Sequence, residues 1–228
     1  MTIDPVAEPK AYQELLLGLL GADDPAAAQA QTPGLLRELV DEAASDLRTR
    51  PAPDEWSVIE CVGHIVDAEV VYSGRYRWIL AHDRPELPGY DQDLWTDRLH
   101  HGDADPDELL ALFMPLRAAN LALWERTPVA ERARFGLHRE RGPESYDLSF
   151  RLIGGHDRFH VAQARRALEL VRGSGRGDPV GLLTAHEVGT HANDDGGQAD
   201  PDAQRRHDHE GQRADGEEHT LGPAHRAP

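Results

Sequence analysis

Cysteine is nearly absent from this chain of 228 residues, and long apolar runs are absent altogether. The single cysteine, Cys61, excludes an internal disulfide framework and is typical of a protein from a reducing compartment. No apolar run is long enough to cross a bilayer. The opening MTIDPVAEPKAYQELLLGLLG also lacks the basic stretch and long apolar core of a signal peptide. We therefore expect a soluble, cytoplasmic protein without a membrane partner.

Positive charge is scarce as well. The chain has 24 Lys and Arg residues against 41 Asp and Glu residues, which gives a formal net charge of -17. A surface with this excess of negative charge repels a phosphate backbone. The composition therefore argues against nucleic acid as a partner.

Aromatic residues are missing from the last part of the chain. Residues 173–228 contain no Phe, Trp, Tyr or Ile, and the large aliphatic side chains there are Val180, Leu182, Leu183, Val188 and Leu221. Such a segment buries too little apolar surface to offset its chain entropy. We predict that it forms a disordered acidic tail. Its scattered histidines, six of the 13 in the chain, are also compatible with weak metal binding.

Helix signals dominate the first 172 residues. Thr32 and Pro33 are suited to the cap and the first position of a helix that ends at the Pro-Ala-Pro of residues 51–53. Ser57 and Glu60 form a capping box, which predicts a second helix that begins at Ser57 and ends near residue 81.

Two further helices follow. One begins at Asp105 and Pro106 and contains an internal proline, Pro115, and the last covers roughly 147–172 with Gly173 as its stop. The connections 83–104 and 127–146 show no alternating strand pattern of useful length. We predict an all-α fold in which residues 32–172 form a four-helix bundle. An N-terminal extension, 1–31, precedes the bundle with a short helix at about 12–20, and the tail, 173–228, follows it.

Two histidines four residues apart mark the last predicted helix. His156 and His160 project from the same face of that helix and can share one first-row metal ion. Gly154 and Gly155, just before them, weaken the helix by roughly 1 kcal/mol each relative to alanine. Either plain packing or the close approach of a neighbouring helix or ligand explains these glycines.

A third imidazole comes from the second helix. His64 lies among Val62, Ile65 and Val66, so we expect it inside the bundle, where a hydrogen-bonded core histidine is the alternative to a metal ligand. One histidine from this helix and two from the last form an arrangement that bundles use to bind metals. Three imidazoles would leave an open coordination position, as catalytic zinc sites do.

Four neighbouring side chains are candidates for supporting roles. Asp67 could orient His64 or a bound water, with an exposed helix charge as the alternative. Gln163, one turn past His160, could reach the metal site or a backbone carbonyl. Glu60 already serves as a cap, and a small buried core residue is the better interpretation of Cys61 than a fourth ligand or reactive thiol.

Four stretches of the chain resemble the corresponding parts of a known protein family. They are EWSVIECVGHIVDAE, GYDQDLW, HRERGPESYDL and GGHDRFHVAQ. Between about Leu35 and Leu170 the chain resembles the DinB-like superfamily, which includes YfiT-type metal-dependent hydrolases and bacterial thiol S-transferases. The resemblance implies a helical bundle that holds a divalent metal, often zinc or nickel, through a histidine triad. Carried over residue by residue, the ligands are His64, His156 and His160.

The resemblance also implies an activity. We expect a metal-dependent S-transferase that acts in detoxification on a small-molecule substrate and a low-molecular-weight thiol. The alternatives are hydrolysis by a metal-bound hydroxide and a non-catalytic metal-binding stress-response protein. Three histidines suit iron and copper as well as zinc and nickel. Relatives often pair, so a homodimer is a further expectation, and no catalytic residue is assigned.

Overall fold

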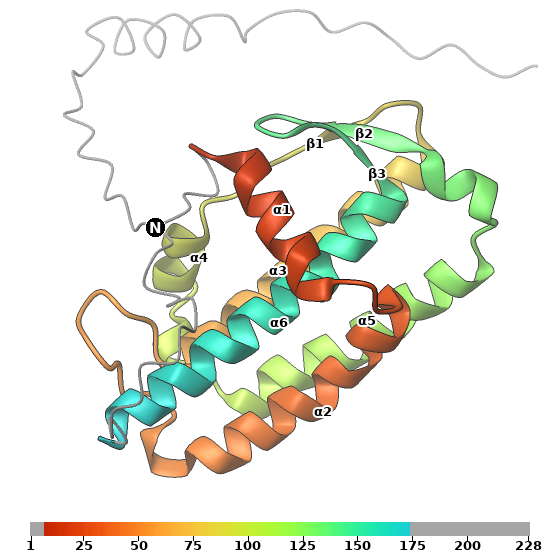
Figure 1. The fold of residues 1–228 in the computed structure, drawn as a ribbon. Coiled ribbons are helices and arrows are strands. Elements are labelled where there is room, and N and C mark those ends of the chain that lie inside the picture. Colours follow the sequence, from red (N-terminus) through yellow and green to blue (C-terminus); the bar gives the residue numbers. More distant parts are fainter. Residues whose placement is uncertain (1–6, 174–228) are drawn as a thin grey trace, which may run out of the picture. The chain divides into compact units, whose positions relative to one another are not determined.

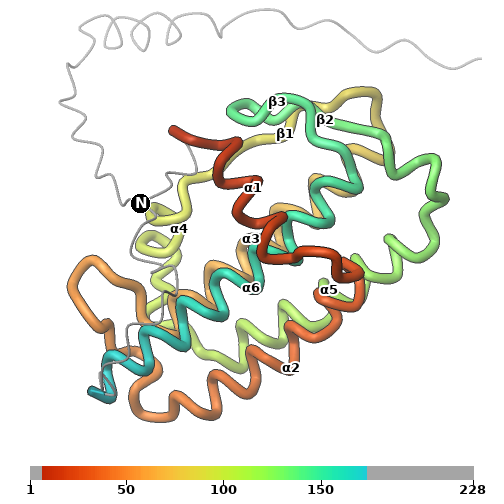
Figure 2. Tube along the Cα trace, viewed as in Figure 1, coloured from red at the N-terminus to blue at the C-terminus, as the bar shows by residue number. Residues whose placement is uncertain are grey.

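A computed structural model of the protein describes residues 7–173. The predicted disordered tail, apart from Gly173, lies outside the described residues. Four long helices form the bundle: α2 (Pro25–Ala43), α3 (Val58–Ala81), α5 (Pro106–Arg126) and α6 (Tyr146–Val171). Helices α2 and α3 each pack against both α5 and α6. The ribbon and the Cα trace show the course of these four helices (Figures 1 and 2). The prediction of an all-α four-helix bundle is confirmed.

Apolar side chains fill the bundle in two large clusters. Leu36, Ile59 and Phe113, from three different helices, belong to the first. The second is aromatic, and in it Trp124 stacks on Phe150 with 4.1 Å between ring centroids. Each fully buried side chain of this size stabilises the fold by about 1.5–3 kcal/mol, so burial by all four helices explains the architecture.

The capping signals place three of these helices correctly. Ser57 caps α3 as predicted, and Asp105 caps α5, where its side chain accepts a hydrogen bond from the Asp107 amide at 2.8 Å. Helix α6 begins and ends within a residue of the predicted bounds, and Gly173 follows it with a φ of 65°.

The predicted start of α2 at Thr32 was wrong. Asp24 caps this helix instead, accepting from the Ala27 amide at 2.8 Å, and Pro25 occupies the first turn. Pro33 lies inside the helix, because the packing of α2 against two neighbours outweighs the cost of about 3 kcal/mol for an internal proline. The predicted division between residues 31 and 32 therefore falls within a helix.

The two long connections contain regular structure that we did not predict. Strands β1 (Glu86–Leu87), β2 (Phe135–His138) and β3 (Gly142–Ser145) form a small sheet in the order β1-β2-β3, with β1 parallel and β3 antiparallel to β2. Strands this short cannot display a recognisable alternation in the sequence. The first connection also holds the short helix α4 (Gln92–Arg98), and the 3-10 helices are η1 (Ala44–Asp46), η2 (His101–Asp103) and η3 (Val129–Ala133).

Helix α1 (Pro9–Leu20) confirms the predicted N-terminal helix and explains the two glycines of α6. It crosses α6 in direct contact (Figure 1). A Cβ atom at Gly155 would overlap the carbonyl oxygen of Leu16 and lie 2.6 Å from its carbonyl carbon. At Gly154 a Cβ atom would meet the Leu20 side chain at 3.1 Å. Close approach of a neighbouring helix is therefore the reason for these glycines.

Candidate metal centre

The first turn of α3 fixes the position of His64. The Glu60 carboxylate accepts hydrogen bonds from the backbone amide and the hydroxyl of Ser57, at 2.8 and 2.6 Å. Arg50 forms an ion pair with the same carboxylate. The capping hydrogen bonds and the ion pair together hold the first turn, so that the helix begins at a defined residue. His64 then lies on the buried side of α3, where it is 1% exposed.

Helix α6 supplies the other two imidazoles. His156 and His160 are one turn apart and are 7% and 2% exposed. Helix α1 packs directly on α6 at Gly155, the residue before His156. This contact keeps solvent away from that part of α6. The predicted burial of His64 is confirmed, and His156 and His160 are buried as well.

The three imidazoles converge. Nε2 of His64 lies 3.0 Å from Nε2 of His156, and one nitrogen from each of the three rings lies within 4.8 Å of the others. Nδ1 of His160 lies 2.8 Å from Oε1 of Gln163, and its Nε2 is buried without a hydrogen-bond partner among the described residues. A buried nitrogen without a partner is costly, so this donor set fits a divalent metal ion.

Electrostatics keeps these imidazoles neutral. Burial lowers the pKa of His160 to about 4. Burial lowers the pKa of His64 and of His156 well below 6.5, and the neighbouring imidazoles lower both further. Arg117 and Arg141 add to the effect on His156. At neutral pH each ring therefore keeps a lone pair that can bind a metal.

Aromatic rings line the site. The ring of Trp56 lies 5.1 Å from that of His64 and 6.1 Å from that of His160, measured between centroids. Tyr90 lies 6.3 Å from His64, and Phe159 lies 4.9 Å from His160. These side chains lower the local polarity, which strengthens electrostatic interactions at the site.

The two side chains predicted to support the triad, Gln163 and Asp67, make different contacts in the structure. Gln163 contacts a triad member directly. Asp67 is 8% exposed and contacts Nε2 of His101, not His64, through Oδ2 at 2.7 Å. The ring of His101 packs over Gly63, where a Cβ atom would lie 2.5 Å from its Cγ. The sequence offers no signal for this pair, because its partners are 34 residues apart and meet only in the folded chain.

Cys61 takes no part in the cluster. It is a free cysteine within the apolar core, and burial raises the pKa of its thiol. Its interpretation as a small core residue is confirmed by this burial.

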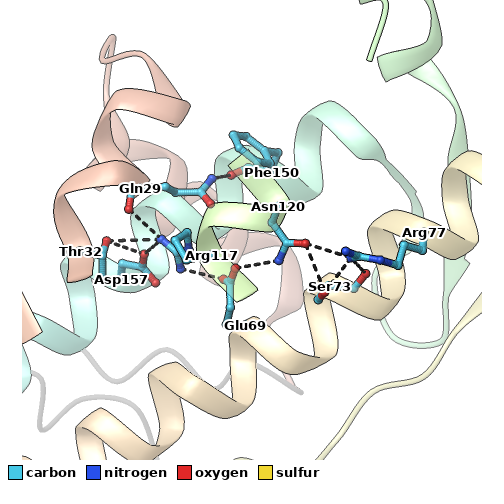
Figure 3. Close-up of polar contacts among 9 residues, drawn as sticks. All are labelled: Gln29, Thr32, Glu69, Ser73, Arg77, Arg117, Asn120, Phe150 and Asp157. Carbon is cyan, nitrogen blue, oxygen red and sulfur yellow. Dashed lines mark hydrogen bonds and ion pairs between the residues drawn. The ribbon is translucent and has the colours of Figure 1, made fainter. Parts of the chain in front are cut away.

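Asp157, the neighbour of His156 in the chain, belongs to a buried charge network. Figure 3 shows this network. Arg117 forms ion pairs with Asp157 at 2.6 Å and with Glu69 at 2.8 Å, and all three side chains are at most 4% exposed. The hydroxyl of Thr32 donates to Asp157 at 2.8 Å, and the amide of Asn120 donates to Glu69 at 2.7 Å. The network links α2, α3, α5 and α6, so its residues lie far apart in the sequence and no local pattern predicts it.

Acid should destabilise the metal-free protein between about pH 6.5 and pH 4. Within this interval the unfolded chain binds protons at histidines whose pKa is lowered in the folded state. The stability that these neutral imidazoles confer above pH 6.5 is therefore lost as the pH falls toward 4. The shift at His160 alone corresponds to a loss on the order of 3 kcal/mol.

Denaturant unfolding in the presence of a chelator, at about pH 7 and about pH 5, measures this loss. A His160→Gln variant should show a weaker pH dependence, whereas a variant of the exposed His100 should match the wild type. Equal unfolding free energies at the two pH values would contradict the expectation.

Comparisons with known proteins agree with this architecture. The model of the DinB superfamily matches residues 26–164. The chain is similar to the solved structure of YfiT from Bacillus subtilis, described as "a probable metal-dependent hydrolase with an unusual four-helix bundle topology". The identity is 22% and the TM-score 0.57, over 74% of this chain and 89% of that one, so this likeness establishes the fold. No curated protein matches. Within residues 7–173, none of the helices combines the length and apolarity that a membrane span requires.

Proposed function

The chain belongs to the DinB superfamily, and from this membership and the converging imidazoles we propose that it is a metal-dependent hydrolase of a small-molecule substrate. The observation that carries the proposal is the buried cluster of His64, His156 and His160, three neutral nitrogen donors from two helices. A purely structural core would satisfy these imidazoles with hydrogen bonds, yet Nε2 of His160 has no such partner among the described residues.

The three imidazoles would hold a divalent cation, which when bound supplies Lewis-acid chemistry by polarising a carbonyl or phosphoryl oxygen and lowering the pKa of water. Zinc and nickel are the ions we favour, and iron and copper accept the same donors. Gln163 would hold the ring of His160 in one orientation through Nδ1. Trp56, Tyr90 and Phe159 would exclude bulk water.

Hydrolysis has more support than the thiol transfer that the sequence suggested. YfiT, which shares the fold, is described as "a probable metal-dependent hydrolase". Thiol transfer remains a prediction that an assay can separate from hydrolysis. A homodimer likewise remains a prediction.

Metal content tests the site directly. The full chain, purified without a polyhistidine tag, should contain about one equivalent of a first-row divalent metal, because three imidazoles bind one ion. His64→Ala and His156→Ala should each lose it, and His100→Ala, which alters an exposed loop histidine, should retain it. Elemental analysis of the four proteins measures the difference. Retention of the metal by both triad variants would place it elsewhere.

Activity tests the reaction class. Activated esters and amides should be hydrolysed by the metal-loaded protein without added thiol, and turnover should disappear in His156→Ala. The same substrates and a set of electrophiles are then assayed with a low-molecular-weight thiol. Turnover that depends strictly on the thiol would replace hydrolysis with transfer. A folded, metal-loaded protein that turns over none of these compounds would favour a structural metal site.

Gln163→Leu should weaken metal binding by about 10- to 100-fold, because it removes the hydrogen bond that orients a ligand. Gln31→Leu, an exposed glutamine of α2, is the matched control and should bind the metal as the wild type does. Competition with a chromophoric chelator measures both affinities. Equal affinities in the two variants would exclude an orienting role for Gln163.

A further inference from the structure

A second polar cluster lies between the triad and the β2–β3 hairpin. Arg141 and Glu144 belong to the hairpin, Tyr12 to α1, and Tyr72 and Arg75 to α3. The guanidinium of Arg141 donates from Nε to Glu144 at 2.8 Å and from Nη2 to the hydroxyl of Tyr72 at 3.4 Å. Arg75 lies over the Tyr72 ring, with 4.7 Å from its guanidinium carbon to the centroid. The proposed hydrolysis assigns no role to these five side chains.

Helix geometry gives the separation of this cluster from the triad. Tyr72 is eight residues after His64 on α3, which corresponds to about 12 Å along the axis. Ser149, whose hydroxyl donates to Glu144 at 2.8 Å, is seven residues before His156 on α6, or about 10 Å. Arg141 is close enough to the triad to contribute to the lowered pKa of His156. The cluster and the triad therefore lie about 10 Å apart along the same helices.

The cluster has more positive than negative charge. Its two guanidiniums face one fully buried carboxylate, Glu144, and the ion pair of that carboxylate is with Arg141. Arg75 is 1% exposed and donates instead to the Pro88 carbonyl and to Nε2 of His138, at 2.5 and 3.2 Å. Within residues 7–173 no carboxylate forms an ion pair with Arg75, and its Nε is buried without a partner. A buried guanidinium without a carboxylate partner is costly, and the binding of an anion beside it would reduce that cost.

Two phenols complete the cluster with neutral donors. Tyr12 and Tyr72 are 8% and 7% exposed, and burial raises the pKa of both hydroxyls. The hydroxyl of Tyr12 makes no hydrogen bond within the described part of the chain. It is within electrostatic reach of both Tyr72 and Arg141. The Tyr72 hydroxyl contacts the Arg141 guanidinium directly, and phenol and guanidinium donors of this kind suit the oxygens of a carboxylate.

We propose that Arg141, Tyr12 and Tyr72, backed by the charge of Arg75, bind a carboxylate of the substrate about 10 Å from the group that reacts at the triad. This inference rests on the proposed function, because it takes the triad as the reaction centre. It narrows the substrate class to elongated small molecules with an anionic end.

Binding of suberate, a straight-chain dicarboxylate, to the full chain tests the proposal, with its neutral diamide as the comparison ligand. Calorimetry is done on metal-free and on zinc-loaded protein. Suberate should bind both forms, and the diamide should bind at least 10-fold more weakly, since one charge-assisted hydrogen bond contributes about 1.5–3 kcal/mol. The metal-free arm does not depend on hydrolysis, so the subsite can stand if the hydrolase assignment fails.

Three variants identify the residues involved. Arg141→Gln/Glu144→Gln removes the guanidinium without leaving Glu144 ionised and unpaired, and should weaken suberate binding at least 10-fold. Tyr12→Phe, which loses no hydrogen bond within the described residues, should weaken it several-fold without a change in stability. Arg151→Gln removes a half-buried arginine of α6 whose ion pair is with Asp147, and this variant should bind suberate normally.

The result that overturns the proposal is equal suberate affinity in the wild type and the double variant. Equal affinity for suberate and its diamide, or no suberate binding to either form of the protein, overturns it as well. Carboxylated and neutral ester substrates then separate recognition from reaction. In the double variant the ratio of KM for the carboxylated ester to KM for the neutral ester should rise, whereas Arg151→Gln should leave this ratio as it is in the wild type.

Discussion

Replacing Arg117 with methionine should lower the free energy of unfolding by about 3–5 kcal/mol. The substitution keeps an unbranched side chain but leaves Glu69 and Asp157 buried without their shared cation. Two ionised carboxylates that lose their partner in the interior carry the full cost of desolvation. Because a typical domain has only about 5–15 kcal/mol of stability, a substantial share would be lost. Denaturant unfolding of metal-free wild type and variant at neutral pH measures the difference.

Two further proteins test the cause of this loss. Arg37→Met removes an arginine whose ion pair with Asp107 lies at the surface, where Asp107 is 76% exposed, and should leave the free energy of unfolding close to that of the wild type. The triple variant Arg117→Met/Glu69→Gln/Asp157→Asn removes the unpaired charges and should recover part of the stability. If the triple variant is less stable than Arg117→Met alone, uncompensated charge is not the cause.

Replacing Gly155 with alanine should lower the free energy of unfolding by about 2–4 kcal/mol, although alanine is the better helix former. The new methyl group would overlap the backbone carbonyl of Leu16, and a backbone atom cannot rotate away as a side chain can. Helix α1 would have to move off α6, and the burial of Tyr12, Leu16 and Leu152 would be reduced. Denaturant unfolding measures the stability. Easier proteolysis within α1 would show the displacement.

Gly34→Ala in α2 is the matched control for Gly155→Ala. A Cβ atom at Gly34 meets nothing within 4 Å, so only the helix-propensity effect applies, and stability should rise by up to about 1 kcal/mol. Opposite signs for the two substitutions are the expected outcome. An equal gain in the free energy of unfolding at both positions would contradict the close approach of α1 to α6 at Gly155.

Local signals explain why much of the fold was predictable. A cap or a proline acts within one helical turn, so Ser57, Asp105 and Gly173 placed the ends of three helices from the sequence. The prediction of a helix start at Thr32 was wrong because the Thr32 hydroxyl, which could have capped a helix, donates to Asp157 of another helix. The strands were missed because pairing between residues 86–87 and 135–138 is a long-range contact that leaves no local pattern.

By itself the sequence determined the amphipathic helices, the one-turn spacing of His156 and His160, and the burial of His64, because each depends on residues within a few positions along the chain. Only the tertiary structure decided that the three imidazoles meet, that Asp67 contacts His101, and that Arg117 holds two carboxylates. These contacts depend on how four helices pack against one another. The free energy of that packing is spread over the whole core, so no single short segment of the chain specifies it.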